Sequence, residues 1–207
     1  MNGAVAVRRL WLVRHGETEG QSSIRFHGRN DVALNEHGRA QIRALAPLLA
    51  HVPFVRVVHS PLRRAAESAA ILASLCGATA VPHHADERLR EISFGACEGM
   101  TEAEIEAAFP GFLAAHRAGR VDAFPDGEPR PSFAARVAAA ALALEADAWQ
   151  GDVLVVSHRG TVRQALRALL RVPAAAPDQF GVELASVSVL AERGSGGWQL
   201  EALGLRP

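Results

Sequence analysis

The stretch LWLVRHG, residues 10–16, joins a short apolar run to an arginine, a histidine and a glycine. Two further runs of this kind occur at Val55–Val58 (VRVV) and Val153–Val156 (VLVV). All three are rich in β-branched residues and too short for helices, so they are predicted to be buried strands. A helical pattern follows each of them. Repeated strand-then-helix order is typical of an α/β domain with a mainly parallel sheet.

Three helices are predicted after these strands. Asn35 is positioned to cap the first, in which apolar residues recur at helical spacing. Ser60-Pro61 has the pattern of an N-cap followed by proline in the first turn, and it opens a helix over Leu62–Leu75. The third helix contains Val162 and continues until Pro173 stops it.

The C-terminal part of the chain has the pattern of a β-hairpin. Ala185–Leu190 alternates in polarity, and a glycine-rich turn at Arg193–Gly197 leads into Trp198–Leu203. Such a hairpin fits an antiparallel edge of the same sheet.

Residues 98–132 differ from the rest of the chain. Thr101 and Glu104 form a capping box for a short helix, which Phe109-Pro110 ends, and a loop rich in proline and charge follows. We interpret this segment as a helical, lid-like insertion. The whole chain, residues 1–207, is then one domain, a three-layer α/β/α sandwich with a mainly parallel central sheet.

Composition limits the classes of function. Of the 207 residues, 49% are hydrophobic and 21% charged, so a sizeable core is expected. Lys+Arg and Asp+Glu each number 22, and this balance argues against binding to nucleic acid or a membrane surface. Cys76 and Cys97 are too few for a disulfide framework and lack metal-ligand spacing. Neither a signal peptide nor a membrane span is recognised, so a cytoplasmic protein is expected.

Arginines and histidines gather just beyond the three predicted strands. Arg14-His15-Gly16 follows the first, His59–Arg63 the second and Ser157–Gly160 the third. Ligands of open α/β sheets bind at the carboxyl ends of the strands, so these residues are expected to form one cationic pocket. Guanidinium groups and helix N-termini match phosphate oxygens. The pocket is therefore predicted to hold a phosphoryl group without a metal or other cofactor.

Other interpretations of this cluster fit the sequence less well. A metal centre is disfavoured because Arg14 and Arg63 would repel a cation and no HExxH pattern occurs. Ser157 lies in VVSHR rather than in the GxSxG elbow of serine hydrolases. No Walker loop is present either.

Five ordered segments resemble the histidine phosphatase superfamily, the phosphoglycerate-mutase-like family. They are LVRHGETEG (12–20), GRNDVALNEHG (28–38), HSPLRRAAESA (59–69), LREISFGACEG (89–99) and VVSHRGTVRQAL (155–166). The resemblance spans nearly the whole chain. It implies a two-step reaction through a phosphohistidine intermediate.

The resemblance also implies roles for individual residues. His15 attacks phosphorus, and water later hydrolyses the adduct. Arg14, Arg63 and His158 hold the phosphoryl oxygens and stabilise the transition state. Glu91 donates a proton to the leaving oxygen and later accepts one from water. The nearby guanidiniums are expected to lower the pKa of His15, which keeps its nitrogen nucleophilic.

Four more residues are implied to contact the substrate. His27 and Gly28 are assigned to a loop that closes over phosphate, because Gly28 permits close backbone approach. Gln21 stands near the position where the family usually has asparagine, and Arg159 replaces a usual glycine, so the contacts of both stay open. A basic stripe at four-residue spacing is interpreted as a solvated helix face: Arg163, Arg167 and Arg171.

The predicted function is hydrolysis of a small-molecule phosphate monoester, because LREISFGACEG is closer to the phosphatase than to the mutase form. The alternatives are a cofactor-dependent phosphoglycerate mutase, an alpha-ribazole phosphatase as a specific member, and a non-catalytic phospholigand-binding protein. The expected partner is a small phosphorylated metabolite, with no nucleic acid and no membrane. A homodimer is left open.

Overall fold

A six-stranded sheet in the order β3-β2-β4-β1-β5-β6 forms the centre of the protein. The structure is a computed structural model, and it describes residues 7–173, 176, 179–193 and 197–207. The parallel part of the sheet consists of β1 (Arg9–Arg14), β2 (Phe54–His59), β3 (His83–Ala85) and β4 (Asp152–Ser157). At the other edge, β5 (Val187–Arg193) pairs antiparallel with β1, and β6 (Gly197–Leu205) pairs antiparallel with β5.

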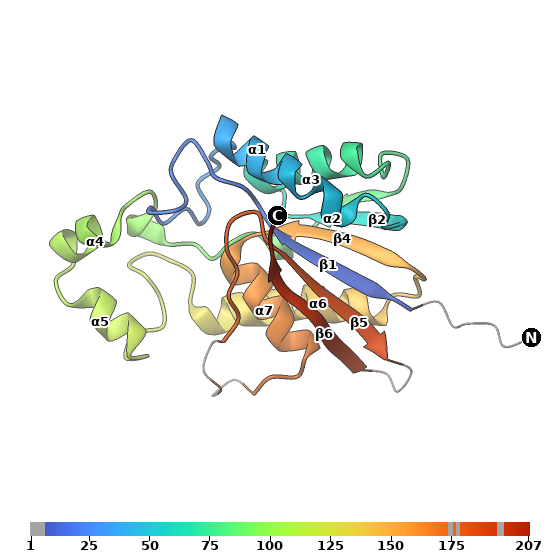
Figure 1. Cartoon of the computed structure of the whole chain (residues 1–207). Coiled ribbons are helices and arrows are strands. Elements are labelled where there is room, and N and C mark those ends of the chain that lie inside the picture. Colours follow the sequence, from blue (N-terminus) through green and yellow to red (C-terminus); the bar gives the residue numbers. More distant parts are fainter. Residues whose placement is uncertain (1–6, 174–175, 177–178, 194–196) are drawn as a thin grey trace, which may run out of the picture.

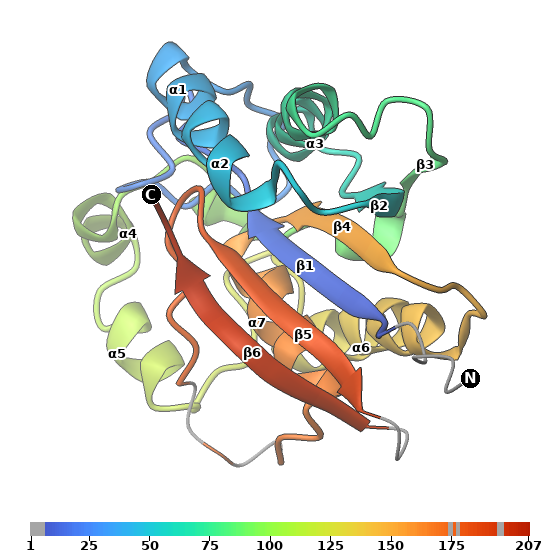
Figure 2. The same ribbon diagram turned by 45° about the vertical axis from the view of Figure 1, so that its right-hand side comes forward.

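Helices cover both faces of this sheet (Figures 1 and 2). One face carries α1 (Glu36–Ala44), α2 (Ala46–Leu49) and α3 (Arg63–Leu75), and the other carries α6 (Arg130–Ala146) and α7 (Arg159–Leu169). The predicted three-layer α/β/α sandwich is confirmed.

Two buried apolar clusters separate the three layers. Leu12 and Val155 belong to the cluster under α6 and α7, whereas the next residue of each strand, Val13 and Val156, belongs to the cluster under α1 and α3. Successive strand residues point to opposite faces of a sheet. Both faces of the central strands are covered, so apolar residues occur at every position, as the uninterrupted runs indicate.

Several predicted local signals are confirmed. The amide of Gly38 donates to Asn35 Oδ1 over 2.8 Å at the start of α1. The capping box of Thr101 and Glu104 opens α4 (Glu102–Ala108). The C-terminal hairpin is β5–β6, although residues 194–196 of its turn lie outside the described part of the chain.

The predicted N-cap at Ser60 is wrong. Helix α3 begins at Arg63, and its N-cap is the extended Leu62, which makes no capping side-chain bond. The Ser60 hydroxyl lies 2.8 Å from His158 Nε2 instead, so it links the ends of β2 and β4. The helix therefore starts later than predicted, with two arginines in its first turn.

The segment predicted as a lid lies beyond the carboxyl ends of the parallel strands (Figure 1). It contains α4 and α5 (Phe112–Arg117), and its last residues enter α6. Two short 3₁₀ helices, η1 (Glu87–Leu89) and η2 (Gly95–Cys97), precede it. Three of its residues, Ile105, Leu113 and Phe124, form a small apolar cluster with Cys97 of η2.

Within the described part of the chain, none of the helices has the length and apolar character that crossing a membrane requires.

Candidate active site

Two buried histidines meet where β1 and β4 end. Arg14 pairs with Ser157 in the parallel register of the two strands, so His15 and His158 follow at the same level. Their ring centroids are 5.2 Å apart. The His15 amide donates to Ser157 O, and the Ala185 amide donates to His15 O, so the backbone of His15 is fixed on both sides.

The His15 ring is oriented for attack through Nε2. Its Nδ1 lies 2.7 Å from the carbonyl oxygen of Gly16. A carbonyl can only accept, so Nδ1 carries the proton and Nε2 of the neutral ring keeps its lone pair. Gly16 is required here because a Cβ at this position would lie 2.4 Å from the carbonyl oxygen of Gly38 in α1.

The buried arginine beside the histidines is Arg64, not the predicted Arg63. The Arg64 side chain is 0% exposed, and its Nε donates to His158 Nδ1 over 3.2 Å. The Arg63 side chain is exposed, and its backbone amide donates to Asp31 Oδ1 over 2.7 Å. Neighbouring residues of a helix point about 100° apart. Only one of the two arginines can therefore face the sheet.

Arg64 also holds a loop over the histidines. Its Nη1 donates to Asn30 O over 2.9 Å, and its Nη2 donates to the carbonyl oxygens of His27 and Gly28 over 3.1 and 2.7 Å. Gly28 thus accepts a hydrogen bond from Arg64 through its backbone carbonyl, whereas the sequence predicted a contact between Gly28 and the substrate. Burial is the main cause that lowers the pKa of Arg64 to about 10, which leaves the guanidinium charged at neutral pH.

Glu98 fixes the other side of this loop and was not predicted. Its carboxylate accepts the amides of Gly28 and Arg29, each over 2.8 Å, and that of Phe94 over 2.9 Å. The backbone amides of this loop point to Glu98, and the backbone carbonyls of the same loop point to Arg64. Local sequence patterns do not reveal such a role, because it depends on contacts about 70 residues apart in the chain.

Arg14 connects the histidine pair to an open cavity. Its Nη1 donates to Val182 O over 3.0 Å, while its buried Nε has no hydrogen-bond partner among the described residues. Burial, followed by the like charge of Arg159, lowers the pKa of Arg14 to about 10. A buried guanidinium N–H of this kind suits an anionic oxygen of a ligand.

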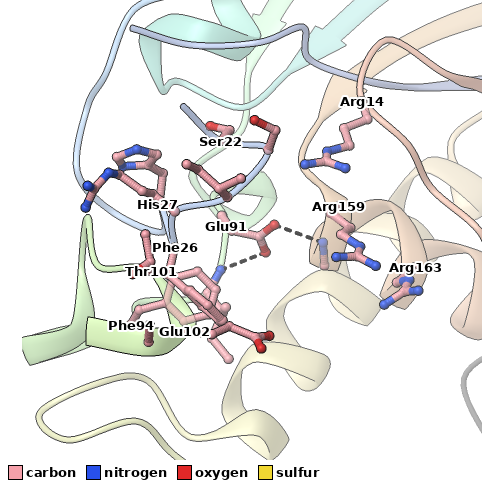
Figure 3. Close-up of a pocket in the computed structure, with 16 residues that line it drawn as sticks. Arg14, Ser22, Phe26, His27, Glu91, Phe94, Thr101, Glu102, Arg159 and Arg163 are labelled. Carbon is pink, nitrogen blue, oxygen red and sulfur yellow. Dashed lines mark hydrogen bonds between the residues drawn. The ribbon is translucent and has the colours of Figure 1, made fainter. Parts of the chain in front are cut away.

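Glu91 lies across the cavity from Arg14 (Figure 3). Its two carboxylate oxygens accept the amide of Ile92 over 3.0 Å and that of Gly160 over 2.8 Å. A Cβ at Gly160, in the first turn of α7, would lie 2.5 Å from Glu91 Oε1, so glycine leaves room for the carboxylate in this position. Glu91 is 6% exposed, and the two backbone amides fix the direction of its carboxylate.

The cavity has a volume of about 550 Å³. It is lined by Arg14 and by parts of segments 22–27, 91–94, 101–103 and 159–163. His27 and Arg159 are on its wall, whereas the exposed Gln21 is not, and no contact of Gln21 with the histidines is present among the described residues. His15 and His158 lie outside the lining, next to Arg14. Arg163, predicted to be on a solvated face, lines the cavity instead.

Burial and neighbouring cations keep both histidines neutral. Desolvation is the largest cause that lowers the pKa of His15 well below 6.5, and the positive charges of Arg64 and Arg14 are the next largest. The pKa of His158 is lowered well below 6.5 by desolvation, then by Arg64 and His15. The predicted lowering of the His15 pKa is confirmed, although burial lowers it more than the guanidiniums do. A neutral imidazole is the nucleophilic form.

These shifts predict that the protein loses stability as the pH falls below 6.5. Below pH 6.5 the unfolded chain binds protons at His15 and His158, whereas the folded chain keeps both rings neutral. Their contribution to the free energy of unfolding is therefore fully present above pH 6.5 and is lost as the pH falls towards the lowered pKa values. Each histidine adds a slope of up to about 1.4 kcal/mol per pH unit. His116 in α5, whose pKa is lowered to about 4 mainly by burial, adds to the slope.

Urea unfolding at pH 7.5, 6.5 and 5.5 checks this expectation, because most carboxylates titrate below that range. The variant His158→Gln is expected to show a smaller slope, whereas replacing the exposed His51 by asparagine leaves the slope unchanged. Equal stability at pH 7.5 and 5.5 in the unmodified protein contradicts neutral, buried histidines.

A family model and named relatives match most of this chain. The family model described as "Histidine phosphatase superfamily (branch 1)" matches residues 10–206. A glucosyl-3-phosphoglycerate phosphatase from Mycobacterium tuberculosis (strain CDC 1551 / Oshkosh) is 36% identical over 177 residues, covering 81% of this chain and 78% of that protein. An adenosylcobalamin/alpha-ribazole phosphatase from Salmonella typhimurium is 35% identical over 176 residues, covering 84% and 86%.

A solved structure extends the likeness to the whole fold. The crystal structure of the alpha-ribazole phosphatase from Shigella flexneri has a TM-score of 0.85 and 27% identity, and the match covers 96% of both chains. The family model spans nearly the whole sequence, including the two histidines and Glu91. The chain therefore belongs to the histidine phosphatase superfamily, branch 1.

Proposed function

We propose that this protein hydrolyses a small-molecule phosphate monoester through a phosphohistidine formed on Nε2 of His15. The observation that carries the proposal is a buried, neutral imidazole whose Nδ1 proton is held by Gly16 O, beside two buried guanidiniums, Arg14 and Arg64. Its relatives are named as phosphatases, and the chain is a phosphoric monoester hydrolase of this superfamily.

In the first step, Nε2 of His15 forms a bond to phosphorus while the ester P–O bond breaks. Arg14 and Arg64 balance the charge on the non-bridging oxygens, and His158 supports Arg64. Glu91 gives its proton to the leaving alkoxide, so the product leaves as an alcohol. The Gly16 carbonyl stabilises the ring as Nε2 becomes phosphorylated, because Nδ1 keeps its proton.

In the second step, water attacks phosphorus and the N–P bond breaks. Glu91, now a carboxylate, accepts a proton from the water, which returns both residues to their starting forms. The two backbone amides on Glu91 keep its carboxyl group directed across the cavity from Arg14 in both steps. No metal takes part in this scheme.

The natural substrate is a small phosphorylated metabolite, in line with the substrates that the relatives' names give. A cavity of about 550 Å³ admits an alcohol of moderate size beside the phosphoryl group. We further propose that the protein works in the cytoplasm, where its free Cys76 and Cys97 stay reduced.

Glu91→Gln is expected to lower kcat/KM by on the order of 10²- to 10⁴-fold for alkyl phosphates and much less for p-nitrophenyl phosphate. Nitrophenolate leaves without proton donation, so only the alkyl esters need the acid. Glutamine cannot accept from both backbone amides, but that distortion affects both substrates equally. Steady-state kinetics on the two substrates give the measurement, and equal losses would deny Glu91 the role of acid.

A panel of phosphate monoesters tests the proposed function itself, with released inorganic phosphate as the readout. We expect hydrolysis of several members without added metal. Failure to release phosphate from any of them contradicts the proposal. A mutase is distinguished in the same assay, because 2,3-bisphosphoglycerate would stimulate phosphoryl transfer to 3-phosphoglycerate instead of hydrolysis.

A further inference from the structure

Glu91 lies in a stretch of chain that forms neither a helix nor a strand. Residues 90–94 connect the two 3₁₀ helices η1 and η2. A general acid has to lie within hydrogen-bond reach of the oxygen that it protonates, so its position matters to within a fraction of an ångström. The position of Glu91 is therefore set by contacts from other elements, and several of these contacts come from one side chain of α6.

That side chain is Arg136, which donates to three backbone carbonyls at and before Glu91. Its Nη1 donates to the carbonyl oxygens of Arg88 and Arg90 over 2.8 and 2.7 Å, and its Nη2 donates to that of Glu91 over 3.0 Å. The carboxylate of Glu91 accepts two backbone amides on the cavity side (Figure 3). Both ends of this residue, its backbone and its carboxylate, are thus fixed by hydrogen bonds.

Glu128 fixes the orientation of the Arg136 guanidinium. Its Oε1 accepts from Nε over 2.6 Å and its Oε2 from Nη2 over 2.7 Å, in the two-pronged geometry of an arginine–carboxylate pair. Burial works against the charged carboxylate, yet the hydrogen bonds from Arg136 hold the pKa of Glu128 below its usual range. Together with the three carbonyls, this pairing gives an acceptor to each of the five N–H groups of the guanidinium.

Glu128 also holds the chain just after Glu91. Its backbone amide donates to the carbonyl oxygen of Ser93 over 3.0 Å, and its Oε2 accepts the Ser93 amide over 3.4 Å. The Arg136–Glu128 ion pair therefore contacts the chain on both sides of Glu91. It joins this irregular stretch to a regular helix, α6, which is packed on the sheet.

The ion pair does not face the substrate. Neither Arg136 nor Glu128, both within the described part of the chain, lines the cavity. The guanidinium carbon of Arg136 lies 4.8 Å from the centroid of the Phe133 ring, on the same helix. Any effect of the pair on catalysis has to pass through the residues that it positions, and Glu91 is the titratable group among them that reaches the cavity wall.

We propose that the Arg136–Glu128 ion pair positions Glu91 for its two proton transfers, to the leaving oxygen and from the attacking water. The two residues of the pair are positioning residues, because neither touches the reacting atoms. This assignment rests on the proposed phosphatase activity, in which Glu91 is the acid. Its consequence is that the pair matters for leaving groups that need a proton and not for those that leave without one.

Arg136→Lys tests the proposal, because lysine keeps the charge but carries its three N–H donors on one nitrogen. It can pair with Glu128 but cannot serve three carbonyls as well. We expect kcat/KM to fall by about 10- to 100-fold for the alkyl phosphate that is hydrolysed fastest in the panel, and by less than about threefold for p-nitrophenyl phosphate. A general loss of structure lowers both values together, so the ratio of the two reports on the acid.

A double-mutant cycle separates an effect through Glu91 from an independent one. In the Glu91→Gln protein the acid is already lost, so adding Arg136→Lys is expected to lower kcat/KM for the same alkyl phosphate by less than about twofold. Losses that multiply would show that Arg136 acts on another part of the site.

The matched control is Arg56→Lys. Arg56 of β2 pairs with Asp147, the C-cap of α6, so the same chemical change is made in another ion pair of the same helix. The control is expected to leave the ratio of the two kcat/KM values unchanged. An equal change in the control would mean that loosening α6 is sufficient, and would contradict a specific role of Arg136.

Glu128→Gln provides a second variant in case Arg136→Lys does not fold. Glutamine keeps the size of the side chain but has only one oxygen to accept from Arg136, so the ratio is expected to change in the same direction. Arg29 also lies 3.7 Å from this carboxylate, but that contact does not involve the acid and its loss affects both substrates alike. Circular dichroism and thermal melting of each variant establish that the fold is retained.

Three results would overturn the inference while the phosphatase proposal stands. They are unchanged kcat/KM for both substrates in the folded Arg136→Lys variant, equal losses on both substrates, and losses that multiply with those of Glu91→Gln. Absence of hydrolysis by the unmodified protein for every substrate, including p-nitrophenyl phosphate, would instead contradict the phosphatase proposal, and the positioning role with it.

Discussion

Replacing His15 by alanine is expected to reduce phosphate release by on the order of 10⁴-fold or more, the largest effect of any single substitution in this protein. His15 supplies the atom that forms the bond to phosphorus. The neighbouring ring, His158, cannot substitute for it, because its Nε2 is at Ser60 and its Nδ1 at Arg64. Initial rates of phosphate release give the measurement.

The same variant separates an enzyme from a protein that only binds phosphorylated ligands. An enzyme loses turnover, whereas a binder keeps its affinity, because Arg14 and Arg64 remain in place. Removal of a buried ring also leaves a cavity, so thermal melting has to show that the variant is folded at the assay temperature. Turnover within tenfold of the unmodified protein in a folded His15→Ala variant excludes His15 as the nucleophile.

Arg64→Ala is expected to lower kcat/KM by about 10²- to 10³-fold, because a buried guanidinium that stabilises the transition state is lost. The matched control is Arg63→Ala, one position earlier, which is expected to change kcat/KM by less than about twofold because its side chain is exposed. The two variants have the same chemical change and nearly the same position in the sequence. Steady-state kinetics on one substrate compare them directly.

Loss of the Arg64 side chain also removes the donor to three loop carbonyls, so part of its effect is on stability. Arg64→Lys keeps the charge but not the forked geometry, and it is expected to fold better while still losing most of the activity. An equal effect of Arg63→Ala and Arg64→Ala would contradict the placement of Arg64 beside the histidines.

The choice between these two arginines shows what the sequence can predict about the site. The strand ends and the gathering of cations there follow from local patterns, because buried parallel strands have a strong apolar signal. The strand-end pattern does not show which face of α3 each arginine occupies, and this decides which of them is buried. Arg64 shares a face with the buried Ser68 and Leu72, whereas Arg63 shares one with the exposed Ala70 and Ser74. Four-residue spacing within the helix could therefore have identified Arg64.

Other parts of the structure have no local signal. Strand β3 is three exposed residues, His83–Ala85, and it exists because it pairs in parallel with the end of β2. Glu98 acquires its role from loop amides far away in the sequence. Arg163 was assigned to solvent because helical spacing alone does not show what the basic face of α7 contacts. In each case tertiary packing decides, and periodicity gives no information about it.

The cavity combines an aromatic side with a charged side. Phe26 and Phe94 line it, and both pack against Phe124 of the 98–132 segment. The sheet side supplies the guanidiniums and Glu91. A phosphate ester with a polar end and a carbon skeleton is matched to such a site.

The most direct test of the central claim is to trap the phosphorylated enzyme. The protein is mixed with an isotopically labelled phosphate monoester, quenched at alkaline pH within the first turnover and digested, and the labelled peptide is mapped. A phosphorylated His15, labile to acid and labelled at Nε2, is the predicted result. Label on another residue, or turnover without any labelled protein when hydrolysis of the intermediate is slowed by Glu91→Gln, would contradict covalent transfer to His15.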